Sequence, residues 1–168
     1  VLPGEEVEEL AVLPELAEPE LGPALGGLDD GLDRRASPAL CDRLRESTLA
    51  VGAYYKCPDC REWHFNSSAG FVIGEGGIVC TCCHVVIAED EGVKESYLIA
   101  ADAQGRVYPV RAVVAADPDA DTCFVKIEAS GLKPLPLRPG IRTGERVYCL
   151  SHPGGYYFMF TQGLVARL

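Results

Sequence analysis

The sequence has few basic residues and no basic stripe. It holds 15 lysines and arginines against 25 aspartates and glutamates, for a formal net charge of −10 at pH 7. Ten acids and two arginines lie within residues 1–35, so this segment carries −8 and residues 36–168 carry only −2. Because binding to nucleic-acid phosphates relies on clustered lysine and arginine, we expect no nucleic-acid partner.

Long apolar runs are also absent. A membrane-spanning helix needs about 20 consecutive, mostly apolar residues, and no stretch of this chain approaches that length. There is no basic and apolar leader at the start, and the first residue is Val1, which fits a mature or trimmed product. We expect no membrane segment in this chain.

Helical periodicity is scarce as well. Residues 1–36 mix glutamate, leucine, proline and glycine, with prolines too frequent for a long helix. This composition predicts an extended acidic arm or linker, and a pro-segment or a docking tail are the alternatives. The remaining residues, 37–168, are expected to form one folded domain, since 48% of the sequence is hydrophobic and the length is sufficient for one core.

Residues 37–168 consist mainly of short apolar segments separated by turn residues. Ser37-Pro38 predicts the start of a short helix that ends near Glu46. Alternation and turn signals predict strands over residues 48–55, 69–73, 78–83, 96–100, 107–114, 121–127 and 145–150. Residues 56–64 are expected to interrupt this pattern as an insertion. Strands spaced in this way, with no long helix among them, indicate an antiparallel barrel or a sandwich.

Two polar residues stand at strand ends and are candidates for one site. His84 lies in the run Val-Cys-Thr-Cys-Cys-His-Val-Val over residues 79–86, directly after the strand predicted to follow a glycine turn. Asp121 closes the run Asp-Pro-Asp-Ala-Asp over residues 117–121 and opens the next apolar strand. A histidine that acts as a base needs a carboxylate to hold its tautomer. We therefore expect the His84 and Asp121 side chains to lie within hydrogen-bonding reach.

These two runs resemble those of trypsin-like serine proteases, specifically of the HtrA/Deg type. The first barrel of that family carries a T-x-x-H-V-V run and, later, a D-P-x-x-D run that opens a strand. The resemblance extends over about residues 37–168. It implies an all-β fold: an antiparallel six-stranded trypsin-like β-barrel, the first barrel of a two-barrel protease, with a short N-terminal helix and an extended acidic N-terminal arm.

The resemblance also implies a function, a serine endopeptidase acting on protein or peptide substrates. His84 would be the general base and Asp121 the carboxylate that orients it. The family's nucleophile lies in a G-x-S-G-G run that this sequence lacks, and none of Ser67, Ser68, Ser130 and Ser151 matches it. We expect the nucleophile beyond Leu168, in a second barrel that is this domain's partner, and we expect the chain alone to be inactive.

A second constellation lies in the Cys57-Pro58-Asp59-Cys60 turn. Two cysteines at this spacing can bind one zinc ion, His64 offers a third ligand, and Cys41, Cys82 and Cys83 are candidates for a fourth. The alternatives are a structural disulfide or paired thiols, a zinc site, and a redox dithiol. We expect no other cofactor. This loop also supports a different function, a non-catalytic protease-like module that binds a protein partner or zinc.

Eight cysteines are many for a cytosolic protein and permit disulfides in an oxidising compartment. We expect a periplasmic or extracellular location, with a cytoplasmic one as the alternative. Cysteines inside strands, however, commonly serve as small buried hydrophobes. Cys80, Cys83, Cys123 and Cys149 are therefore predicted to be buried free thiols. Cys80 and Cys82 are expected on one face of their strand and Cys83 on the other.

Overall fold

The structure is a computed structural model that describes residues 36–86 and 93–168. It contains one helix, α1 (Ala36–Arg45), where the sequence predicts one. Eight strands follow: β1 (Thr48–Lys56), β2 (Trp63–Gly74), β3 (Ile78–Thr81), β4 (Ser96–Ala101), β5 (Val107–Asp117), β6 (Thr122–Ile127), β7 (Arg146–Ser151) and β8 (Met159–Leu164). The predicted acidic arm lies outside the described residues. Among the described helices, none is long and apolar enough to cross a membrane.

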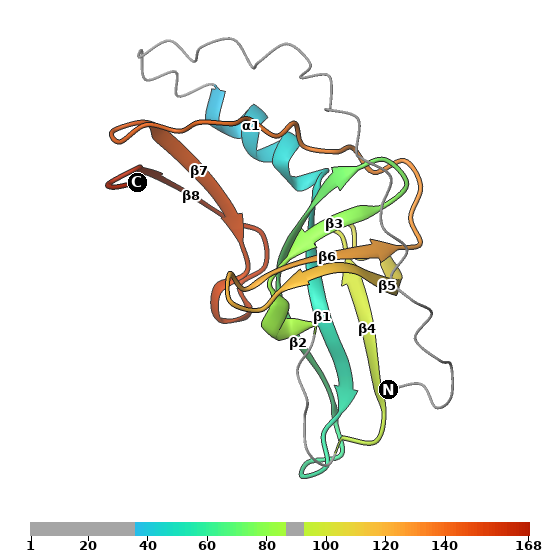
Figure 1. The fold of residues 1–168 in the computed structure, drawn as a ribbon. Helices are drawn as coiled ribbons and strands as arrows, with labels where there is room; N and C mark the ends of the chain where they lie inside the picture. The colour runs from blue at the N-terminus through green and yellow to red at the C-terminus, as the bar shows by residue number, and fades with distance from the viewer. Residues whose placement is uncertain (1–35, 87–92) are drawn as a thin grey trace.

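Six of the strands close an antiparallel barrel in the order β1-β2-β3-β6-β5-β4 (Figure 1). Closure comes from β1, which pairs with β2 on one side and with β4 on the other. The predicted six-stranded barrel is therefore confirmed. Its interior is filled by small β-branched and aliphatic side chains, and the fully buried ones are Leu49, Val51, Val72, Val79, Cys123, Val125 and Ile127.

The predicted insertion at residues 56–64 belongs to a long hairpin. β1 and β2 pair without a break from Thr48↔Phe71 to Lys56↔Trp63, so β2 begins well before the expected residue 69. In Figure 1 this hairpin extends from the barrel together with β4. The expected interruption is present but shorter, since residues 57–62 form the turn between the strands. Residues 63–68 complete a continuous ladder with β1 even though their sequence is mostly polar.

A glycine allows β1 and β2 to approach each other closely. A Cβ atom added to Gly52 would lie 2.0 Å from the carbonyl oxygen of Asn66 and 2.7 Å from the Cα atom of Ser67. Both atoms belong to the backbone of β2, so neither can move aside as a side chain does. Only glycine fits this position of the ladder.

The strand predicted over residues 78–83 is shorter than expected. β3 ends at Thr81, and Cys83–Val85 form one turn of 3₁₀ helix. The Cys83 amide donates to the Asp121 carbonyl at 3.2 Å, in the register of the β3–β6 ladder, and the side chains of Cys83 and Val85 are buried. The expected alternation of faces is confirmed, since Cys80 and Cys82 are half-buried and Cys83 is buried, and the turn places the exposed His84 on the outside of the barrel.

The strand predicted over residues 145–150 is present as β7 but is not part of the barrel. β7 and β8 form a separate two-stranded sheet beside it (Figure 1). Because β1 and β4 already close the barrel, no free edge remains for β7. The link between the two parts is His152, whose Nε2–H donates to the Leu49 carbonyl of β1 at 3.2 Å and whose Nδ1 accepts the Phe158 amide at 2.8 Å.

Candidate active site

The ends of two paired strands bring His84 and Asp121 together. β3 and β6 are antiparallel, with Thr81 opposite Cys123. The chain that leaves β3 therefore passes the residues that enter β6. His84 lies in the 3₁₀ turn after β3, and Asp121 directly precedes β6. The register of one strand pair thus determines where both side chains stand.

The Asp121 carboxylate holds His84 at two points. Its Oδ1 accepts the His84 backbone amide at 3.0 Å, and its Oδ2 lies 2.8 Å from the Nδ1 atom of the ring. An ionised carboxylate is only an acceptor, so Nδ1 carries a hydrogen, and in the neutral ring Nε2 then has the free lone pair. This contact matches the proximity expected from the sequence.

The turn before β6 sets the direction of Asp121. The Ala120 amide donates to Oδ1 of Asp117 at 3.0 Å, and the Asp121 amide donates to the Pro118 carbonyl at 3.2 Å. Asp121 itself has a φ of 49°, in the left-handed region. Aspartate enters this region more readily than most residues other than glycine. The run Asp-Pro-Asp-Ala-Asp thus forms a tight turn that ends with its last carboxylate aimed at the histidine.

The hydrogen bonds from His84 also favour the charged form of Asp121. The backbone amide of His84 is the largest influence and the ring is the second, and together they hold the pKa of Asp121 below its ordinary 3.8. The carboxylate is therefore ionised throughout the neutral range. Both side chains reach solvent, with 64% of His84 and 48% of Asp121 exposed. Within the described residues, the Nε2 atom of His84 has no hydrogen-bond partner.

Cys82 stands beside this pair, whereas the sequence analysis named it only as a candidate zinc ligand for the Cys57 and Cys60 turn. Its Sγ atom, a ring nitrogen of His84 and a carboxylate oxygen of Asp121 all lie within 4.8 Å of one another. Its Sγ atom also lies 3.3 Å from the Oγ atom of Ser68 in β2. A signal existed in the sequence, because Cys82 precedes His84 by two residues, but only the 3₁₀ turn brings the two side chains together.

No serine in the described part of the chain completes a triad. Ser68 contacts Cys82 rather than His84. Ser67 pairs with Gly52 in the barrel ladder, and Ser151 ends β7. Ser130 lies in the coil after β6, at the end of that strand remote from Asp121. The arrangement therefore supplies a base and its orienting carboxylate, without a nucleophile in contact with them.

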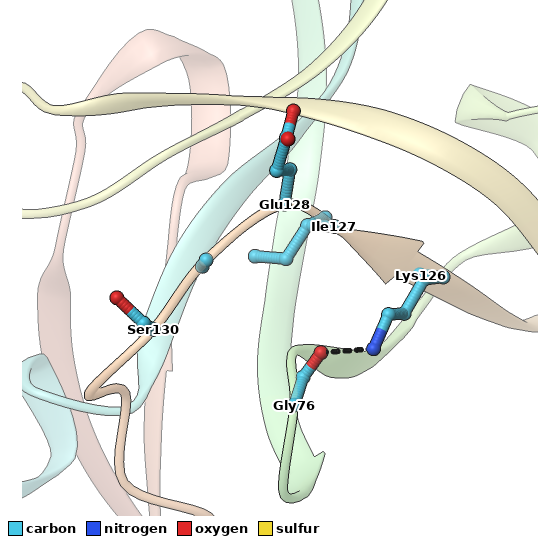
Figure 2. A pocket seen from close by; sticks show the side chains of 6 residues that line it. Gly76, Lys126, Ile127, Glu128 and Ser130 are labelled. Atoms are coloured by element: carbon cyan, nitrogen blue, oxygen red, sulfur yellow. Dashed lines mark hydrogen bonds between the residues drawn. The ribbon is translucent and has the colours of Figure 1, made fainter.

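A shallow depression is found at the opposite end of the β3–β6 pair. Gly76, Lys126, Ile127, Glu128 and Ser130 line it (Figure 2). Lys126 donates to the Gly76 carbonyl, as Figure 2 shows, and Glu128 is paired with Arg111. Since its charged groups are already engaged and it holds neither cysteine nor histidine, the depression is not a candidate catalytic site.

The turn between β1 and β2 brings the predicted metal or disulfide residues together. The ligand atoms of Cys57, Cys60 and His64 lie within 4.8 Å of one another. Both thiols are free in the structure. The amides of Cys60 and Asp59 and the Cys60 thiol donate to the sulfur of Cys57, which lowers the pKa of Cys57 below its ordinary 9.0. His64, which the sequence analysis named as a third ligand, thus lies with the two cysteines in one cluster.

The remaining cysteines follow the prediction in part. All eight cysteines have free thiols. Cys83 and Cys123 are buried, as expected, and burial raises the pKa of Cys123 to about 11. Cys80 is only half-buried. The prediction was wrong for Cys149, which is exposed. Cys149 lies in β7, and that strand has no barrel neighbour to cover it.

Comparison with known proteins agrees with this geometry. Residues 68–168 match the family described as trypsin-like peptidase domain, a span that includes His84 and Asp121. The chain is also similar to Protease Do-like 5, chloroplastic, of Arabidopsis thaliana. The two are 30% identical over 110 residues, which cover 61% of this chain and 34% of that protein. The aligned part thus spans about a third of the relative's length.

Proposed function

Because this chain belongs to the family of trypsin-like peptidases, we propose that it is the part of a serine endopeptidase that carries the general base, His84, and the carboxylate that orients it, Asp121. The observation that carries the proposal is the two-point contact between them, at 3.0 and 2.8 Å. A carboxylate that holds both the backbone and the ring of one histidine defines the direction of Nε2. Similarity to a Do-like protease supports the HtrA type.

The proposed chemistry follows from the tautomer. With Nδ1–H bound to Asp121, Nε2 of His84 takes the proton of a serine hydroxyl as that oxygen attacks the substrate carbonyl. The ionised Asp121 stabilises the imidazolium that forms, and Nε2 then gives the proton to the departing amine. General base catalysis of this kind contributes about 10²–10⁴-fold to the rate.

We further propose that the serine is supplied from residues outside this sequence, in a second barrel. Two observations support this. No serine of the described residues contacts His84, and the side chain of His84 is 64% exposed, so a group from elsewhere has room to approach Nε2. The substrates proposed are proteins or peptides, the substrate class that a peptidase family implies.

The test compares the 168-residue chain with the polypeptide extended past Leu168. We expect the chain alone to leave casein intact, and we expect the extended polypeptide to cleave it and to lose this activity in His84→Ala. Cleavage by the chain alone would contradict the proposed source of the nucleophile. If Cys82→Ser abolished that cleavage, the thiol beside His84 would be the nucleophile, and the enzyme would not be a serine peptidase.

The second candidate function is a non-catalytic protease-like module that binds zinc or a protein partner through the Cys57 and Cys60 turn. The observation that favours it is the three-ligand cluster at that turn. The casein assay on the extended polypeptide also distinguishes the module from the peptidase. An extended polypeptide that folds, but does not cleave casein and is not labelled by a serine-directed fluorophosphonate, would support the module.

A further inference from the structure

Three metal-ligating side chains converge at the tip of the β1–β2 hairpin. Cys57 and Cys60 lie in the turn and His64 is the second residue of β2. Their two sulfurs and one ring nitrogen lie within 4.8 Å of one another, with Sγ of Cys60 3.0 Å from Nε2 of His64. We propose that this cluster, the hairpin-tip triad, binds one zinc ion. The proposal does not rest on the peptidase assignment.

The backbone of the turn holds the two cysteines in place. The Cys57 amide donates to the Glu62 carbonyl at 2.9 Å, and the Arg61 amide donates to the Cys57 carbonyl at 3.0 Å. Arg61 has a φ of 62°, a left-handed conformation that is uncommon for a residue with a side chain. The turn is thus closed by hydrogen bonds on both sides of the cysteines, so the triad needs little rearrangement to surround an ion.

His64 is held by the strand ladder and by an aromatic neighbour. It pairs with Tyr55 across the ladder, and the two rings stack with centroids 5.8 Å apart. Adjacent strand residues point to opposite faces, so His64 lies on the face away from Trp63. On that other face, Trp63 stacks on Tyr54 at 4.7 Å and on Tyr97 at 6.1 Å. These stacks limit the movement of the strand that carries the imidazole.

The donor set indicates zinc. Two thiolates and an imidazole suit zinc, whereas magnesium and calcium prefer oxygen ligands. Zinc is usually bound by four ligands, so the fourth position would be taken by water or by a group outside the triad. Cys60 and His64 are exposed, so an ion can enter from solvent.

The other three-residue cluster is a weaker competitor for the ion. Cys82, His84 and Asp121 also lie within 4.8 Å of one another. There, however, both carboxylate oxygens already accept hydrogen bonds from His84, one from its amide and one from its ring. An ion at that cluster would have to displace the ring contact. The hairpin-tip triad also has an internal contact, between Sγ of Cys60 and Nε2 of His64, but it offers two thiols where the other cluster offers one, and thiolates are preferred zinc ligands.

Zinc binding is tested on the reduced 168-residue chain after treatment with a chelator. We expect one equivalent of zinc in a competition titration with a chromophoric chelator, and thiolate-to-metal absorption when cobalt replaces zinc. The chain has one tryptophan, and Trp63 adjoins His64, so its fluorescence should change as the site fills. Loss of a second-shell partner already weakens metal binding by about 10–100-fold, and we expect Cys60→Ser and His64→Ala to weaken it at least as much.

Two controls distinguish this site from the others. Cys82→Ser removes a member of the competing cluster, and Cys149→Ser removes an exposed thiol far along the chain. Both should retain zinc affinity and the tryptophan response. The proposal is overturned if the folded chain binds no zinc at micromolar concentration, if Cys82→Ser loses binding while Cys60→Ser keeps it, or if Cys57 and Cys60 form a disulfide in air that zinc does not prevent. Since His64 lies on the surface, His64→Ala reports on the site even if Cys60→Ser unfolds the turn.

Discussion

The contact between Asp121 and His84 yields a prediction that depends on one atom. In Asp121→Asn, Oδ1 of the amide can still accept the His84 backbone amide, so the turn before β6 should persist. The second carboxylate oxygen, which lies 2.8 Å from Nδ1, becomes an NH₂ group. Two donors cannot face each other, so the ring must carry its hydrogen on Nε2 and leave Nδ1 as the acceptor.

The expected size of the effect follows from this exchange. The contact with the His84 backbone amide remains, while the side chain of residue 121 becomes the donor to Nδ1. The histidine therefore stays in position but in the wrong tautomer. An imidazole with Nε2–H cannot take the proton of a serine. Loss of the carboxylate from a Ser-His-Asp triad without loss of its geometry lowers kcat by about 10⁴-fold, and we expect the same order for casein or peptide cleavage by the extended polypeptide.

Two assays measure the effect separately. Nitrogen-15 NMR of the 168-residue chain reports which ring nitrogen of His84 carries hydrogen, and it requires no nucleophile. Steady-state kinetics of the extended polypeptide report the consequence. Asp119→Asn is the matched control, because Asp119 is an exposed aspartate of the same turn with no hydrogen bond to His84.

Certain results would refute this reasoning. If Asp121→Asn retained Nδ1–H, the carboxylate would not determine the tautomer. If its kcat fell by less than about tenfold, Asp121 would not be the orienting group of a triad. If Asp119→Asn lost as much activity as Asp121→Asn, the effect would belong to the charge of the turn rather than to the contact with His84.

Three other predictions concern the barrel and its cysteines. Burial lowers the pKa of His152 below its ordinary 6.5, so the folded state favours the neutral ring; the stability that this ring contributes is full above pH 6.5 and is lost as the pH falls through the lowered folded-state pKa. Urea unfolding between about pH 7.5 and pH 5 should show this slope, and His152→Phe should remove it. Gly52→Ala should lower the free energy of unfolding by about 1–3 kcal/mol or more, measured in urea, because the added Cβ meets the backbone of β2; an unchanged midpoint would show that the ladder can separate at no cost. Iodoacetamide at about pH 8 should leave Cys123 unmodified, since its pKa is about 11 and it is buried, while the exposed Cys149 reacts; equal rates would contradict the burial of Cys123.

Much of this molecule could be predicted from local sequence. Alternating apolar residues separated by turn signals predict the barrel strands, because the side-chain period of a strand and the conformations of glycine, proline and aspartate are local properties. The turn that ends at Asp121 before a strand, and the turn that holds Cys57 and Cys60, could also be predicted from local sequence. For His84, the partner was predicted from the resemblance of the two runs, in their order, to those of trypsin-like proteases.

What the sequence could not determine is which distant segments meet. The polar first half of β2 joins the ladder only because β1 is long enough to pair with it. β7 stays outside because the pairing of β1 with β4 closes the barrel before it. Cys82 and His84 come to lie beside Asp121 because β3 pairs with β6 in this register. Each outcome depends on hydrogen-bond partners far away in the sequence, and these are decided by the closure of the whole barrel rather than by any local pattern.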